Sequence, residues 1–297
     1  MRHGVVRARG MVARKVACAA PSLIASTVIV GVLVLPALPA AAMAVLGWAG
    51  LAVLGLLVAG RCEAWAVRLV AGGRWPNVSE QRELAPVMAE LRACGFGPAS
   101  IDLFVSRRSG EPSAIARGRR SVVVAPELVH GAIGGQLPRS EAVAVIAHAA
   151  AVSRAGLSRQ DLAILYWTAP WRALRRIGWP LRGLFAAAWQ LRPLVLVVAI
   201  WQSLTTAPQP YGLAAASVIA VLTIYSYLAP RWARSWVEYV AQTGDACVAE
   251  RGLAGPLAAF LRRYPPSVAM TQRINGLQEH GAEPRSRPYL RLISGTS

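Results

Sequence analysis

The residues best placed for chemistry lie in a stretch of small and apolar residues from Ser140 to Gly156. Ser140 is a favourable N-cap, Glu141 suits the positive end of a helix dipole, and Gly156 is a typical stop. The stretch therefore predicts one helix. Residues spaced at i, i+4, i+7 and i+11 share one of its faces; they are Glu141, Val145, His148 and Val152.

A histidine in this setting is where a zinc hydrolase carries H-E-x-x-H, two ligands one turn apart with a glutamate base between them. Here His148 is present, but Ala149 occupies the base position and Val152 the position of the second histidine. A catalytic zinc site needs three protein ligands, an open position for water and a proton acceptor. The helix thus has the position for such a site and lacks most of its groups.

The composition is typical of a membrane protein. Hydrophobic residues make up 55% of the chain and charged residues 15%, with a net charge of +18, and mean hydropathy is +0.42. No lysine or arginine occurs from Val16 to Gly60 or from Pro193 to Pro230. Because the basic residues lie outside these two apolar windows, an anionic membrane surface is favoured over a basic groove for nucleic acid.

Each window has about twice the length that crosses a bilayer. Two prolines interrupt each window near its middle: Pro36 and Pro39 in the first, Pro208 and Pro210 in the second. We therefore expect two helical hairpins with every arginine on the side of the N-terminus. By the positive-inside rule this side is the cytoplasm, so both termini are expected there.

Two alternatives remain for these windows. The first 43 residues also fit a secretory signal peptide, although apolar sequence resumes at once from Val45 to Ala59. The third span is short unless it begins near Leu184 and includes Arg192, so a half-inserted hairpin over 184–207 is the alternative to a full span.

Between the windows the pattern changes to that of a mixed domain. An amphipathic stripe predicts a helix over Glu80–Cys94. β-branched runs predict strands at Ile101–Val105 and Ser121–Ala125, and a short helix follows over Pro126–Ala132. Tyr166–Arg192 then mixes tryptophan with arginine, which favours a membrane interface over a solvated basic face. The four cysteines have no metal-ligand spacing and are interpreted as reduced.

The order of these segments resembles that of the HtpX-like membrane zinc metallopeptidases, relatives of the CAAX prenyl endopeptidases. Ser113–Gly118, S-A-I-A-R-G, is similar to the N-A-F-A-x-G edge strand of that family, and Val122–Leu128 to its V-V-x-x-x-x-L. Glu141–His148 resembles E-x-x-A-V-L-A-H, Glu238–Ala241 resembles the third-ligand motif E-Y-x-A-D, and Pro266–Leu277 resembles H-P-P-x-x-x-R-I-x-x-L. The resemblance covers about residues 61–280.

The resemblance implies a zincin-like domain whose zinc ligands are His148, the residue at 152 and Glu238. The departures fall on these functional positions, because the aspartate expected after Ala241 is Gln242 and Asp245 follows three residues later. A rebuilt site of His148, Glu238 and Asp245 lacks a base unless Glu141 serves. The alternative for His148 is a helix histidine that bonds a carboxylate such as Glu238.

The three other histidines offer little to a metal site. His3 lies in the basic tail and His280 near the polar end of the chain. His130, after the buried strand, either approaches the site or lies on the surface; the surface position is the favoured interpretation. Zinc is thus the cofactor of the family, and we expect none here.

The expected fold is mainly α with a small sheet (α+β): two transmembrane hairpins and a cytoplasmic zincin-like domain. The expected segments are a basic tail 1–15, hairpin 16–60, peptidase-like part 61–183, hairpin 184–230, second peptidase-like part 231–280 and a polar tail 281–297.

We expect a multi-pass pseudoenzyme of the bacterial inner membrane that binds the lipid bilayer and a membrane-protein or peptide partner, and no nucleic acid. The resemblance implies β-augmentation at the edge strand, through Ser113, Ala114, Ile115 and Ala116. Two other functions remain open: an active membrane zinc endopeptidase with a rearranged site, and a structural four-span protein.

Overall fold

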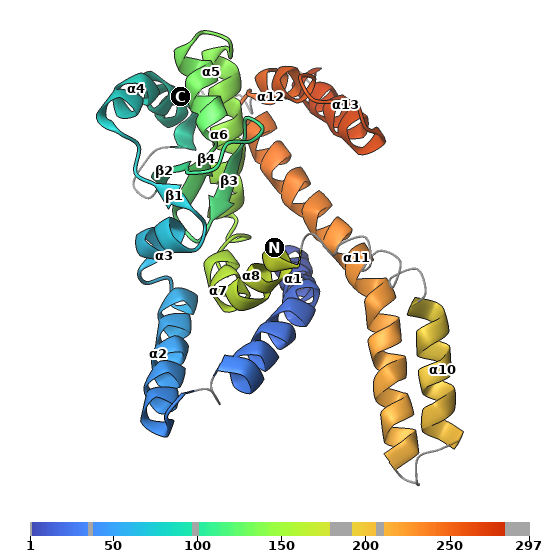
Figure 1. Cartoon of the computed structure of the whole chain (residues 1–297). Helices are drawn as coiled ribbons and strands as arrows, with labels where there is room; N and C mark the ends of the chain where they lie inside the picture. The colour runs from blue at the N-terminus through green and yellow to red at the C-terminus, as the bar shows by residue number, and fades with distance from the viewer. Residues whose placement is uncertain (1, 35–37, 97–100, 179–191, 206–210, 283–297) are drawn as a thin grey trace, which may run out of the picture. The chain divides into compact units, whose positions relative to one another are not determined.

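The structure, a computed structural model, is mostly helical (Figure 1). It describes residues 2–34, 38–96, 101–178, 192–205 and 211–282. Its internal contacts divide the chain into two compact units, each made of two segments. The first unit is formed by Met1–Ala71 and Arg159–Val240, and the second by Gly72–Ser158 and Ala241–Ser297.

The first unit is built of helices. They are α1 (Arg2–Val28) with a π-helical turn (Ile29–Val34), α2 (Ala40–Val58), α3 (Glu63–Leu69), α7 (Asp161–Trp167), α8 (Ala169–Ile177), α10 (Arg192–Thr205) and most of α11 (Tyr211–Glu250). The basic residues 1–15, expected as a tail, are from Arg2 onward the first turns of α1, because no proline interrupts the chain there. Pro230 was expected to separate a span from the following helix, but it lies inside the continuous α11.

Two helices among the described residues are long and apolar enough to cross a membrane: Ala40–Val58 and Gly212–Glu250. The apolar stretch Lys15–Gly31, which runs from α1 into the π-helical turn, is shorter. Helix α10 has 14 residues, where a span needs about 20. Part of the expected third span, 179–191, lies outside the described residues. The membrane character predicted from composition is thus supported by two of the four expected spans.

Polar contacts join α1 to its neighbours within the first unit. Lys15 forms an ion pair with Asp161 at the start of α7, and its ammonium lies 5.1 Å from the ring centroid of Trp236. The indole nitrogen of Trp167 donates to the Thr27 hydroxyl over 2.9 Å. Trp167 therefore contacts another helix of the unit. The later part of the tryptophan- and arginine-rich segment lies outside the described residues.

The second unit contains a four-stranded sheet of β1 (Gly73–Arg74), β2 (Asp102–Ser106), β3 (Ala114–Arg117) and β4 (Ser121–Val124). The strand order is β1-β2-β4-β3, so β3 lies at an edge. The β2–β4 pair is parallel, and the β1–β2 and β3–β4 pairs are antiparallel. The strands expected at 101–105 and 121–125 and the edge strand are confirmed, whereas the two-residue β1 was not anticipated.

Helix α6 (Arg139–Arg154) packs against β3 and β4 and is the centre of the second unit. Its N-cap is Pro138 rather than the expected Ser140, and Gly156 ends the turn after it with φ 73°. Burial extends to nearly all sides of α6, because α4 (Val78–Leu91), α5 (Pro126–Ile133) and α12 (Ala254–Leu261) also pack against it.

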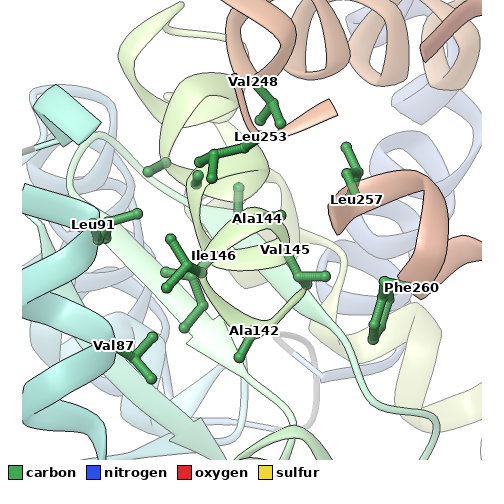
Figure 2. Close-up of a cluster of buried hydrophobic side chains, with 14 of the residues drawn as sticks. Val87, Leu91, Ala142, Ala144, Val145, Ile146, Val248, Leu253, Leu257 and Phe260 are labelled. Atoms are coloured by element: carbon green, nitrogen blue, oxygen red, sulfur yellow. The ribbon is translucent and has the colours of Figure 1, made fainter. Parts of the chain in front are cut away.

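The core around α6 is shown in Figure 2. Ile146 of α6 is fully buried among residues that include Val87 and Leu91 of α4. Helix α12, from the last third of the chain, contributes Leu257 and Phe260 to the same core, and these residues are 2% and 5% exposed. The alanine-rich sequence of α6 explains this arrangement, because small side chains let several elements approach one helix closely.

A polar cap secures α4 beside the sheet. The Asn77 side chain accepts from the N–H of Glu80, and the Glu80 carboxylate accepts from the N–H of Asn77. Arg74 of β1 binds both oxygens of Glu80, over 2.7 and 2.6 Å. These hydrogen bonds, that of Arg74 above all, lower the pKa of Glu80 against the opposing effect of burial.

Candidate functional site

His148 of α6 meets Asp245 of α11 in the second unit. Its Nδ1 lies 3.1 Å from Oδ1 of Asp245, and the two side chains are 17% and 12% exposed. The neighbouring Gly244 makes this approach possible: a Cβ atom there would lie 2.3 Å from Cε1 of the imidazole. The expected hydrogen bond of His148 to a carboxylate is present, but the carboxylate belongs to Asp245 and not to Glu238.

Arg273 of α13 (Val268–Ala282) completes this cluster. Its Nε donates to Oδ2 of Asp245 over 2.5 Å and its Nη2 to Oδ1 over 2.6 Å. Burial alone would raise the pKa of Asp245, but the hydrogen bonds from Arg273 and His148 hold it below its ordinary value. Asp245 is therefore a carboxylate whose two oxygens are already bound by cationic or polar donors.

The pairing with Asp245 assigns roles to the two nitrogens of His148. The short Nδ1–Oδ1 distance places a proton on Nδ1, although Nη2 of Arg273 also lies 3.5 Å from that nitrogen. Nε2 is the ring nitrogen that does not face Asp245. This orientation of a histidine by a carboxylate is the outer-shell arrangement of metal-bound histidines. The contact with Asp245 thus orients the ring of His148.

The positions at which a zinc hydrolase would carry its base and its second histidine hold apolar, buried residues. Ala149 and Val152 are 2% and 6% exposed. Ala241 lies one turn before Asp245 on α11. Glu238 is exposed, lies in the first unit, and precedes Asp245 by about 10 Å along the helix axis.

This donor set does not fit a zinc ion. Among the residues that the structure describes, no group of three or more His, Cys, Asp or Glu side chains is arranged to hold a metal. His148 contributes one nitrogen, and the guanidinium of Arg273 competes with any cation for the oxygens of Asp245. Of the expected set His148, Glu238 and Asp245, the first and last belong to the second unit and Glu238 to the first.

Glu141, considered as a substitute base, is occupied elsewhere. Its carboxylate accepts from Nε and Nη2 of Arg263, over 2.8 and 3.2 Å. Arg263 also donates to the carbonyl of Gln136 over 3.3 Å. The glutamate is thus a structural partner that fixes the end of α12 to the start of α6.

The three remaining histidines lie on other helices than His148. His130 is exposed at the end of α5, in agreement with its interpretation as a surface histidine. His280 lies in α13, and His3 lies in α1.

Among the strands that the structure describes, β3 pairs only with β4, so its other side faces no described strand. The N–H of Ala125 donates to the carbonyl of Ser113, and Ala114 is opposite Val124 in the register of the β3–β4 pair. Hydrogen-bonded and non-hydrogen-bonded pairs alternate in an antiparallel ladder. The N–H and C=O groups of Ala114 and Ala116 therefore point away from β4. Ile115, between them, is 47% exposed.

The sequence identified His148 and Asp245 as candidates, but it did not identify Arg273, which binds Asp245, or Gly244, which lets the histidine approach α11. Arg273 was within reach, because it is the only charged residue in the motif Pro266–Leu277. Gly244 carries no such signal, since glycine inside a helix is uninformative until a close approach is seen.

Comparison of the chain with protein-family models, with curated proteins and with solved structures finds no match.

Proposed function

We propose that this chain is a pseudopeptidase of the HtpX-like type, an integral membrane protein that binds an extended protein segment without hydrolysing it. In this proposal four spans anchor it in the bacterial inner membrane with both termini in the cytoplasm. The two long apolar helices and the absence of basic residues from both apolar windows support this placement.

The proposal rests on the contacts of Asp245, whose carboxylate is already bound by two side chains. Both of its oxygens bind Arg273, and one also binds His148. Water activation requires a metal or a proton acceptor beside the scissile bond. The buried residues on the motif helix, Ala149 and Val152, provide neither.

Binding is assigned to β3. It lies at the edge of the sheet, packs on the helix that carries His148, and turns the backbone groups of Ala114 and Ala116 outward. An added strand would use these groups, which is the β-augmentation mode of peptide recognition.

The test uses detergent-purified full-length protein with fluorescein-labelled reduced β-casein as an extended polypeptide. We expect saturable binding by fluorescence anisotropy, less than 0.1 zinc per chain, and no casein fragments with or without a chelator. Chelator-sensitive cleavage would overturn the proposal.

A matched pair of variants tests the strand. Ala114→Pro removes an outward N–H at the first residue of the strand, where proline is tolerated, whereas Ala114→Val keeps it. We expect casein binding to weaken at least fivefold in Ala114→Pro and less than twofold in Ala114→Val, with similar melting temperatures. Equal binding by both variants would contradict the assignment to β3.

A further inference from the structure

A pocket of about 390 Å³ lies between α12 and α13 of the second unit. Its apolar lining comes from Leu261, Tyr264, Pro266, Met270 and Ile274. Arg262, Thr271, Asn275 and Gln278 add polar groups, and Arg262 is the charged residue among them. An apolar pocket with a few polar groups is the usual form of a ligand site.

The walls of this pocket are attached to the rest of the unit by hydrogen-bonded ion pairs. Arg263, between the two lining residues Arg262 and Tyr264, binds the buried carboxylate of Glu141 on α6. Arg273, next to Ile274, binds Asp245 on α11. Both walls are thus held by carboxylates of the two helices that form the candidate site. A pocket held in this way is preorganised, which lowers the entropic cost of binding.

Tyr264 links the pocket to the edge strand. Its ring lines the pocket, and its hydroxyl donates to the carbonyl of Pro112, two residues before β3 begins. The pocket therefore begins within one side chain's length of the strand that we assign to segment binding.

We propose that the α12–α13 pocket receives a large apolar side chain of the segment that pairs with β3, and that Arg262 favours an acidic residue beside it. The continuity through Tyr264 selects this occupant, because its hydroxyl binds the carbonyl of Pro112, two residues before the strand on which the segment would pair. The inference rests on the proposed function and adds its specificity: an extended segment with an aromatic or branched side chain next to an acidic one.

The experiment measures anisotropy with three fluorescein-labelled peptides. The first is Thr-Val-Thr-Thr-Phe-Glu-Thr-Val-Thr; the second has alanine in place of phenylalanine, and the third has lysine in place of glutamate. We expect the alanine peptide to bind full-length protein at least tenfold more weakly than the first, and the lysine peptide at least threefold more weakly.

Two substitutions on α13 form a matched pair. Thr271 is exposed and lines the pocket, so Thr271→Trp fills it, whereas Gln272→Trp adds the same side chain at an exposed position outside the lining. In Thr271→Trp the preference for phenylalanine over alanine should fall below twofold, while Gln272→Trp should keep it. Arg262→Ala should remove the preference for glutamate over lysine.

The outcomes separate the two proposals. If the phenylalanine and alanine peptides bind equally, or if Thr271→Trp keeps the preference for phenylalanine, the proposal that the pocket receives a side chain is wrong. The assignment of binding to β3 is then still supported by the weaker binding of Ala114→Pro. If Ala114→Pro leaves the affinity for all three peptides unchanged, the strand assignment falls. If no peptide binds, both proposals fall. Melting temperatures of all variants confirm that a loss of binding is not a loss of folding.

Discussion

Arg273 binds both carboxylate oxygens of Asp245, and the same carboxylate holds the imidazole of His148. One aspartate thus joins α6, α11 and α13. The hydrogen bonds satisfy the carboxylate of Asp245, whose side chain is only 12% exposed, and an unpartnered charge in that position would be costly.

We predict that Arg273→Ala destabilises the protein by about 2–3 kcal/mol, because it leaves the charge of Asp245 buried without its main partner; partial exposure of the guanidinium keeps the loss below that of a fully buried pair. Thermal unfolding of detergent-purified protein measures it. Gln272→Ala, exposed on the same helix, is the control and should change the melting temperature little. Equal stability of the two variants would show that the cluster contributes nothing.

The stability of the protein at low pH should depend on the ionisation of Asp245. Its folded pKa lies below the ordinary value of 3.8, so its stabilisation is fully present above that value and is lost as the pH falls through the folded pKa. We predict that the melting-temperature difference between the wild type and Asp245→Asn shrinks as the pH falls below about 4. A difference that grows in acid would contradict the assignment.

Gly244→Ala should destabilise the protein although alanine is the better helix former. Helix propensity alone would favour the substitution by about 1 kcal/mol, but the new Cβ would lie 2.3 Å from the imidazole of His148. Gly276→Ala on α13 is the matched control, since a Cβ there has no neighbour within 4 Å. We expect a lower melting temperature for the first and an unchanged or higher one for the second.

Restoring a zinc site should require position 241. Ala149→Glu with Val152→His supplies a base and a second histidine, and Glu238 is too far along α11 to serve as the third ligand. We predict that this double variant binds less than 0.2 zinc per chain and that adding Ala241→Glu raises binding toward one. Metal analysis after dialysis measures both. Stoichiometric zinc in the double variant would assign the third position to another residue.

Much of the second unit was predictable because its segments have strong local patterns. The β-branched run Ser121–Val124 and the amphipathic stripe of α4 were correctly assigned. The continuation of α11 through Pro230 was not, since proline interrupts a helix in most local contexts but is tolerated where neighbouring groups compensate.

The candidate site was predictable only in part. His148 was identified from its helix face, but which carboxylate it meets depends on how α11 packs against α6. The residues that His148 meets there include Gly244 and Arg273, which lie 96 and 125 residues away in the chain. Local sequence patterns do not report such long-range pairings.

The second unit is discontinuous in sequence, and this has a consequence for synthesis. Residues up to Ser158 form the sheet and α6, but the helices that cover the remaining side of α6 come from the segment after Ala241. A ribosome must therefore translate the 82 residues of Arg159–Val240 before that side of the core can close. During this interval the nascent chain exposes the alanine- and valine-rich surface of α6, and exposed apolar surface of this kind makes a partly folded chain prone to aggregation.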